Sequence, residues 1–240
     1  MFRHKGKSRT YKHNIQIASL LSFVAGIVNV VGFLSVFRLT TNVTGHFTYF
    51  INGILKQNFH MEYVYFIFIF AFFFGSFLSN FLVEYMSQKS ERNIYVIPML
   101  LEVMVLFLIS IFGKYYLHTN PDLIAYCLLF AMGLQNSLVT SISNAAVRTT
   151  HLTGLFTDLG IEISQLFFYK KVEQRKKLMR SIKLRFIIIT FFFIGALIGG
   201  VLYEKMELYV LSFAAATLLL GLIYDNIKLK LILLKRKFAN

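Results

Sequence analysis

Residues 186–204 read FIIITFFFIGALIGGVLYE, and no charged residue interrupts this stretch before Glu204. A transmembrane helix needs about 20 mostly apolar residues, so the stretch predicts one membrane span. Five other stretches meet the same criterion, and two further ones are shorter or more polar. The six full spans are predicted at 15–37, 64–86, 95–117, 122–144, 186–204 and 207–227, and the two short helices at 44–57 and 150–168. We therefore expect an all-α, polytopic membrane protein with eight helical segments in a single membrane domain, 1–240.

Composition and charge at first point in different directions. The chain is 57% hydrophobic and 15% charged, yet its formal net charge is +14. A soluble domain usually has about 25% charged residues, so an ordinary soluble enzyme is disfavoured. Basic chains can bind nucleic acid, but 18 of the 25 basic residues lie in 1–14, 169–185 and 228–237, between long apolar runs. The positive-inside rule predicts such blocks for cytoplasmic segments. We expect a lipid bilayer, and no nucleic acid, as partner.

The number of crossings depends on whether the two short segments span the membrane. With six spans, 21 of the 25 basic residues fall on the cytoplasmic side, and with eight spans 20 do. Charge bias therefore does not choose between the two topologies. Both topologies place the N-terminus, the 169–185 block and the C-terminus in the cytoplasm.

Two nine-residue stretches of the chain resemble each other. They read TTNVTGHFT at 40–48 and TTHLTGLFT at 149–157, with six identical positions. Upstream, Gly26 and Asn29 match Gly133 and Asn136. Downstream, the spacing of Gly75, Ser79 and Glu84 matches that of Gly195, Gly199 and Glu204. This collinear order predicts an internal repeat with halves 1–120 and 121–240.

The repeat has a topological consequence. Six spans would make it an inverted repeat, and eight spans would make the two halves parallel. Inverted repeats with interrupted helices are typical of secondary transporters, whose binding sites lie near the bilayer midplane.

We call the two similar stretches, 40–48 and 149–157, the first and second Thr-Gly motifs. The polar residues in and before these motifs form the candidate substrate site. A helix N-terminus offers free N–H groups and the positive end of the helix dipole, which suit an anionic or carbonyl-bearing ligand. The alternative is structural: Thr44 and Thr153 can cap the short helices, and the two asparagines can bond neighbouring helices. The predicted substrate-binding residues are Asn29, Thr44, Gly45, His46, Asn136, Thr153 and Gly154.

Three acidic residues lie within or beside apolar runs: Glu102, Asp158 and Glu162. A charged carboxylate at the bilayer centre costs at least about 2.5–3.5 kcal/mol, so it should face the bundle interior, be paired or be protonated. These three are the predicted ion-coupling residues, with a proton as the ion. The alternatives are a structural bond for Glu102 and, for Asp158 and Glu162, the polar face of an amphipathic helix.

Catalysis is not expected. No nucleophile with its base, phosphate loop or His-Glu metal helix can be assembled from the sequence, so we predict no enzymatic activity, no cofactor and no metal. Gly75-x3-Ser79 and Gly195-x3-Gly199 are small-residue patterns that let membrane helices approach closely. They predict packing of the two halves, with a homodimer face as the alternative.

Several motifs carry a family resemblance. The run FAMGLQN at 130–136, then AVRTTHLTG at 146–154 and TDLG at 157–160, resembles the second-half signature of the YoaK family of bacterial integral membrane proteins. The stretches 25–33 and 43–45 resemble the first signature. The family typically has Asn after the first Thr-Gly pair, where this chain has His46. The resemblance implies a multi-pass protein of the bacterial inner membrane and names no substrate.

Two functions are expected from these features. The leading hypothesis is a small-solute transporter or permease with a pseudo-symmetric polar site at the Thr-Gly motifs. The alternative is a non-transporting membrane protein that takes part in assembly or stress responses, in which the polar motifs only bond helices together.

Overall fold

The computed structural model describes residues 9–57, 59–89 and 94–237, so part of the first basic block lies outside the described residues. The described chain is helical and contains no strand. Its elements are α1 (Tyr11–Val36), α2 (Val43–Leu55), α3 (Phe59–Lys89), α4 (Val96–Thr119), α5 (Pro121–Ser143), α6 (Leu152–Phe168), α7 (Val172–Met206), the 3-10 turn η2 (Glu207–Tyr209) and α8 (Val210–Lys237). The predicted all-helical class is confirmed.

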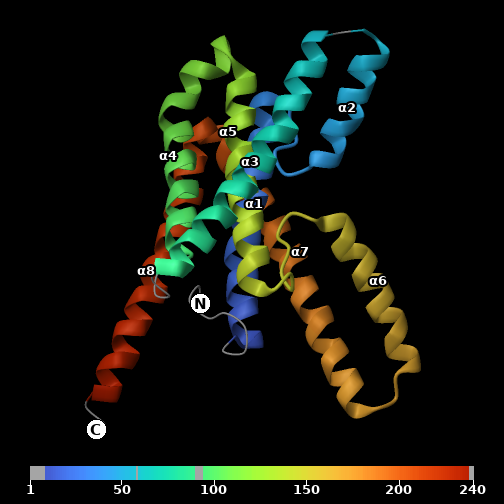
Figure 1. The fold of residues 1–240 in the computed structure, drawn as a ribbon. Coiled ribbons are helices and arrows are strands. Elements are labelled where there is room, and N and C mark those ends of the chain that lie inside the picture. Colours follow the sequence, from blue (N-terminus) through green and yellow to red (C-terminus); the bar gives the residue numbers. More distant parts are fainter. Residues whose placement is uncertain (1–8, 58, 90–93, 238–240) are drawn as a thin grey trace.

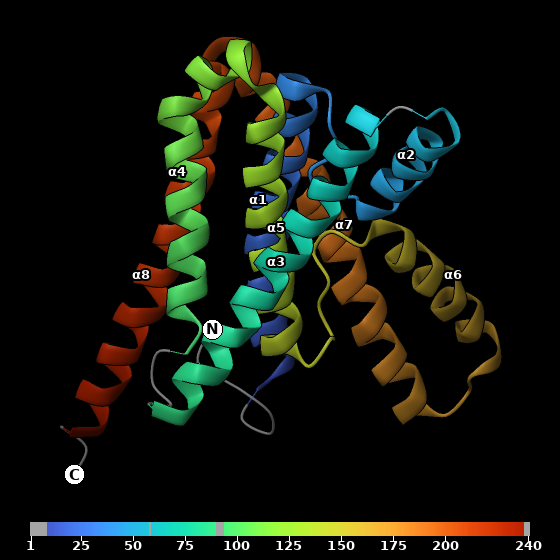
Figure 2. The same ribbon diagram turned by 45° about the horizontal axis from the view of Figure 1, so that its top comes forward.

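Most of the helices are long and apolar enough to cross a membrane. The qualifying stretches are Tyr11–Val36, Met61–Gln88, Val96–Thr119, Pro121–Ser143 and Val172–Asp225, the last of which contains α7, η2 and most of α8. In both views of the ribbon, α1 begins and α8 ends at the lower end of the bundle (Figures 1 and 2). The predicted membrane-spanning character is confirmed.

The helices α2 and α6 differ from the others in length and position. Helix α2 has 13 residues and α6 has 17, which at 1.5 Å per residue gives about 20 and 25 Å. The hydrocarbon core of a bilayer is about 30 Å thick. Both helices begin at mid-height of the bundle and run in opposite directions, α2 upward and α6 downward (Figures 1 and 2).

Similar breaks in the chain precede the two short helices. Helix α1 ends at Phe37 with a φ of 54°, and α5 ends at Asn144 with a φ of 51°. These left-handed residues stop each long helix and turn the chain back toward the middle of the bundle. The connecting segments then start α2 and α6 close together.

Glycines bring two pairs of long helices into backbone contact. A Cβ atom built on Gly26 of α1 would lie 2.1 Å from the carbonyl oxygen of Phe192 in α7. On Gly75 of α3 it would lie 2.2 Å from the carbonyl oxygen of Phe130 in α5. Gly195 of α7 faces α1, and Gly133 of α5 faces α3, in the same way. The predicted packing role of the small residues is therefore confirmed for Gly75 and Gly195.

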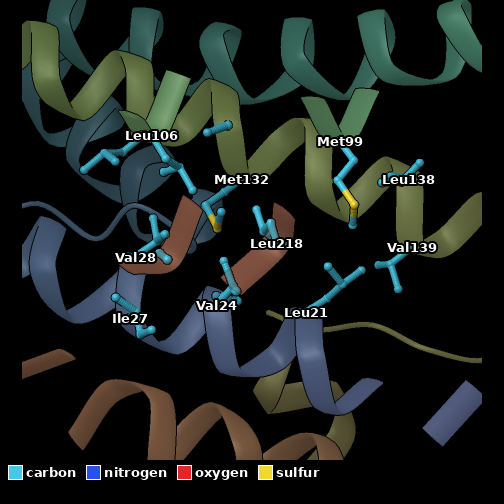
Figure 3. Close-up of a cluster of buried hydrophobic side chains, with 14 of the residues drawn as sticks. Leu21, Val24, Ile27, Val28, Met99, Leu106, Met132, Leu138, Val139 and Leu218 are labelled. Carbon is cyan, nitrogen blue, oxygen red and sulfur yellow. The ribbon is translucent and has the colours of Figure 1, made fainter. Parts of the chain in front are cut away.

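The core lies where α1, α4, α5 and α8 meet. Figure 3 shows the apolar side chains that fill it, which are fully buried: Leu21, Val24, Ile27, Val28, Met99, Leu106, Met132, Leu138, Val139 and Leu218. The outer surface is also apolar, since α3 exposes Phe73, Phe77 and Phe81. A surface of exposed phenylalanines suits contact with lipid chains.

Two sequence expectations need correction. Helix α7 begins at Val172, well before the predicted start of its span at 186, because Lys and Arg favour helix and extend it beyond the apolar run. Thr44 and Thr153 do not cap the short helices. Asn42 holds the cap position of α2, where its side chain accepts the Gly45 N–H, and His151 holds that of α6.

Candidate functional site

A polar cavity lies between the starting ends of α2 and α6. Its volume is about 720 Å³. Eight of its fourteen lining residues have polar side chains, which sets it apart from the almost wholly apolar grooves on the lipid-facing surface. The lining residues are Asn29, Leu39, Thr41, Asn42, Val43, Thr44, Gly45, Thr48, Phe72, Thr150, His151, Leu152, Thr153 and Phe192.

On the side of the cavity formed by the first motif, a bond from α1 holds the segment that leads into α2. The Thr41 hydroxyl donates to the Asn29 side-chain oxygen at 2.7 Å, and the Thr40 hydroxyl donates to the backbone oxygen of Val28 at 3.2 Å. The Asn29 side-chain oxygen therefore has a hydrogen-bond donor inside an apolar helix. The two bonds fix the position at which α2 begins.

On the side of the cavity formed by the second motif, α5 makes the corresponding hydrogen bond. The Thr150 hydroxyl donates to the Asn136 side-chain oxygen at 2.8 Å. Next to it, Gln135 donates from its amide nitrogen to the Thr149 hydroxyl at 3.2 Å and to the backbone oxygen of Leu21 at 3.1 Å. The Gln135 side chain thereby ties the second motif to α1.

The helix starts make the cavity electropositive. The first N–H groups of a helix have no partner within the helix, and the helix dipole adds about half a positive charge at that end. Asn42 accepts one of these groups, the Gly45 N–H, at 3.3 Å. None of the described residues that line the cavity is Asp or Glu. The local field therefore favours a ligand that carries negative charge or an accepting oxygen.

The structure brings only some of the predicted substrate-binding residues to the cavity. Asn29, Thr44, Gly45 and Thr153 line it. Asn136 lies one layer behind, where it borders a shallower polar groove with Ser76, Asn80, Ser137, Thr140 and Ser141. A Cβ on Gly154 would lie 2.3 Å from the His151 ring, so this glycine provides space for that ring beside the cavity.

His46 points away from the cavity. Its Nε2 lies 2.8 Å from the backbone oxygen of Leu39, and its ring is buried against Tyr65 and Phe68 with centroid distances of 5.8 and 4.9 Å. His46 therefore packs α2 against α3. The sequence placed it in the motif but gave no sign of which way it points.

Several cavity residues were missed in the sequence analysis. Thr41 and Thr150 lie at equivalent positions of the two similar stretches, as do Asn42 and His151, so this sequence similarity was a signal that could have found them. Phe72 and Phe192 come from apolar runs in α3 and α7, and nothing in the sequence distinguishes them from the neighbouring phenylalanines.

Asp158 and Glu162 form salt bridges with the same arginine side chain. One nitrogen of Arg185 lies 3.2 Å from an oxygen of Asp158 and 3.1 Å from an oxygen of Glu162. The Ser181 hydroxyl also donates to Glu162 at 2.6 Å. These contacts join α6 to α7 outside the cavity. Arg185 belongs to the basic block, and its role across the hairpin was not visible in the sequence.

Glu102 lies apart from both clusters. Its side chain is fully buried in α4, and neither carboxyl oxygen has a hydrogen-bond partner among the described residues. The expectation that it faces the bundle interior is confirmed. Within the described part of the chain, no group of three His, Cys, Asp or Glu residues is placed to hold a metal ion.

The fold and the site together define a multi-pass helical membrane protein with a polar cavity between two interrupted helices. Residues 17–224 match the model of a family described as "Protein of unknown function (DUF1275)", and the chain belongs to this family. It is 26% identical over 183 residues to the UPF0700 transmembrane protein YoaK of Bacillus subtilis (strain 168), covering 76% of this chain and 80% of that protein. The resemblance to the YoaK family is thereby confirmed. No solved structure matches the chain.

Proposed function

We propose that the protein is a small-solute transporter or permease of the bacterial plasma membrane, with the cavity between α2 and α6 as its binding site. One observation carries the proposal: two short helices begin beside the same polar cavity at mid-height of an apolar bundle. In secondary transporters, interrupted helices leave backbone groups free for a ligand at this depth. The proposed role is binding and passage, with no catalytic step.

We also infer an inverted repeat with six crossings. Helix α1 packs on α7 through Gly26, as α5 packs on α3 through Gly133. The bonds of Thr41 to Asn29 and of Thr150 to Asn136 occupy matching positions in the two halves. The opposite directions of α2 and α6 agree with halves of opposite orientation (Figure 1). Both termini would then lie on one side, which the basic blocks assign to the cytoplasm.

The proposed ligand is anionic or carries accepting oxygens. Both helix starts present N–H groups to the cavity, and the Thr44 and Thr153 side chains add hydroxyl donors. The same dipoles would repel a cation, and the described lining residues include no carboxylate to offset them. Glu102 is the proposed proton-binding group, because it is buried and has no hydrogen-bond partner among the described residues, whereas Asp158 and Glu162 each form a salt bridge with Arg185.

The test is flux through purified protein in proteoliposomes, screened with small carboxylates, phosphates and neutral polar solutes. For the solute that moves, Thr44→Val/Thr153→Val removes both hydroxyls at nearly constant volume, and we expect at least a ten-fold loss of flux. The matched control is Thr217→Val, whose hydroxyl bonds its own helix at the backbone oxygen of Phe213. Unchanged flux in the double variant would show that the site is elsewhere. No flux of any solute would favour the non-transporting alternative.

A further inference from the structure

The hairpin formed by α6 and the first half of α7 stands out from the bundle (Figures 1 and 2). Its sequence is strongly basic at the tip. Between 164 and 185 the chain has eight Lys and Arg residues and one acidic residue, Glu173. Seven of the eight basic residues are exposed, all except Arg185. We call residues 167–183 the basic tip.

Only one acidic residue, Glu173, lies within the basic tip. Asp158 and Glu162 both pair with Arg185, on the face where α6 meets α7. Lys176, Arg180 and Lys183 follow one another at helical spacings of four and three, so they form one row along α7. This row lies on the side of α7 opposite Arg185, since 100° per residue places Arg185 about half a turn away. Three exposed cations therefore lie together on this side of α7.

Large apolar side chains are exposed in the same basic tip. Phe167 and Phe168 are each 79% exposed and Val172 is 81% exposed, while Tyr169 beside them is partly exposed. A surface that combines exposed cations with exposed aromatic rings is typical of segments that lie in the membrane interface. A soluble acidic partner would account for the cations but would leave Phe167 and Phe168 in water.

The length of α6 places the basic tip at the membrane surface. Helix α6 begins beside the cavity at mid-height of the bundle and runs about 25 Å to Phe168. Half of a 30 Å hydrocarbon core is about 15 Å. Even when tilted, α6 therefore ends near the lipid headgroups, where phosphate groups lie.

We propose that the basic tip binds the headgroups of anionic phospholipids, with Lys176, Arg180 and Lys183 on the phosphates and the aromatic residues in the interface. The anionic headgroups supply the negative charge that the row lacks, and the acyl chains cover the exposed rings. Lipid binding at this surface is independent of the proposed transport site.

The test counts bound lipids by native mass spectrometry on the full chain in neutral detergent, titrated with phosphatidylglycerol or phosphatidylcholine. Lys176→Gln/Lys183→Gln removes two charges from the row. Lys56→Gln/Lys205→Gln removes two exposed charges elsewhere and is the matched control. A basic side chain near an anionic surface contributes about five-fold in affinity, so the first variant should bind phosphatidylglycerol about 30-fold more weakly. The control should bind as the unaltered chain does.

The unaltered chain provides a second measurement that needs no variant. Its preference for phosphatidylglycerol should fall as salt rises from about 50 to about 500 mM, because screening weakens exposed charges. Equal binding of the two lipids, or an equal loss in the control variant, would overturn the proposal. Displacement of phosphatidylglycerol by polyglutamate or RNA at equal charge concentration would also overturn it, since the basic tip would then be a general polyanion surface.

Discussion

Gly26 lies directly against the backbone of Phe192, so that a Cβ atom on this glycine would be 2.1 Å from the Phe192 carbonyl oxygen. The contact is between two main chains, and a side chain cannot relieve it by choosing another rotamer. Helices α1 and α7 can approach this closely only while residue 26 has no side chain. Because Phe192 also lines the cavity, the contact lies directly beside the proposed site.

Replacing this glycine tests the contact. Gly26→Ala should lower the free energy of unfolding by about 1–3 kcal/mol, since overpacking outweighs the better helix propensity of alanine. The matched control is Gly160→Ala in α6, where nothing lies within 4 Å of the added Cβ. The free energy of unfolding of this control should be unchanged or higher by up to about 1 kcal/mol. Unfolding in detergent measures the free energy of unfolding of both variants. Equal stability of the two variants would contradict the close contact between α1 and α7 at Gly26.

The proposed topology predicts which loops are reachable from each side. For this test Cys127 is first replaced by alanine. A single cysteine then replaces Lys56, Gln88 or His118, which are all exposed. With six crossings, an impermeant maleimide added outside intact cells labels Lys56→Cys and His118→Cys but not Gln88→Cys. With eight crossings, the pattern reverses, because α2 and α6 would then cross. External labelling of Gln88→Cys would end the inverted-repeat proposal.

The sequence predicted long apolar helices, because a 30 Å hydrocarbon core imposes a length and a composition that can be counted. Six spans were predicted, and five stretches of the described chain qualify by length and composition. The sequence also predicted that the Thr-Gly motifs would lie at helix starts. It did not predict the directions of side chains within a motif. His46 turns toward Leu39 and the rings of α3, and Asn42 replaces Thr44 as the cap, because each choice depends on groups in three dimensions. The pairing of Arg185 was hidden for the same reason.

Arg185 should be the main electrostatic link between α6 and α7. Its side chain and that of Glu162 are 19% and 14% exposed, so Arg185→Gln leaves a largely buried carboxylate without its cation. We expect a loss of about 2–4 kcal/mol in the stability of the hairpin, seen as faster hydrogen exchange across α6. Arg175→Gln removes an exposed positive charge from the same helix. It should change the opening free energy derived from hydrogen exchange by less than about 0.5 kcal/mol. Unchanged exchange in Arg185→Gln would mean that the pairing contributes little to the hairpin.

Substitutions at Glu102 can distinguish a structural role of this residue from a role in proton coupling. It lies one turn from Met99 and Leu106 on the buried face of α4, and no described residue bonds its carboxyl oxygens. If it serves only the fold, Glu102→Leu should lose stability. We expect the opposite, because burying a polar group without a partner costs about 1–3 kcal/mol.

Transport measurements on the same residue then test the coupling. Glu102→Gln keeps the shape of the side chain but cannot exchange a proton, so it should abolish solute accumulation driven by a pH gradient and spare downhill exchange. Glu204→Gln alters an exposed carboxylate and should accumulate solute normally. Normal accumulation by Glu102→Gln would contradict the proposed role of Glu102 in proton coupling. The proposed solute site at the Thr-Gly motifs is tested separately by its own variants.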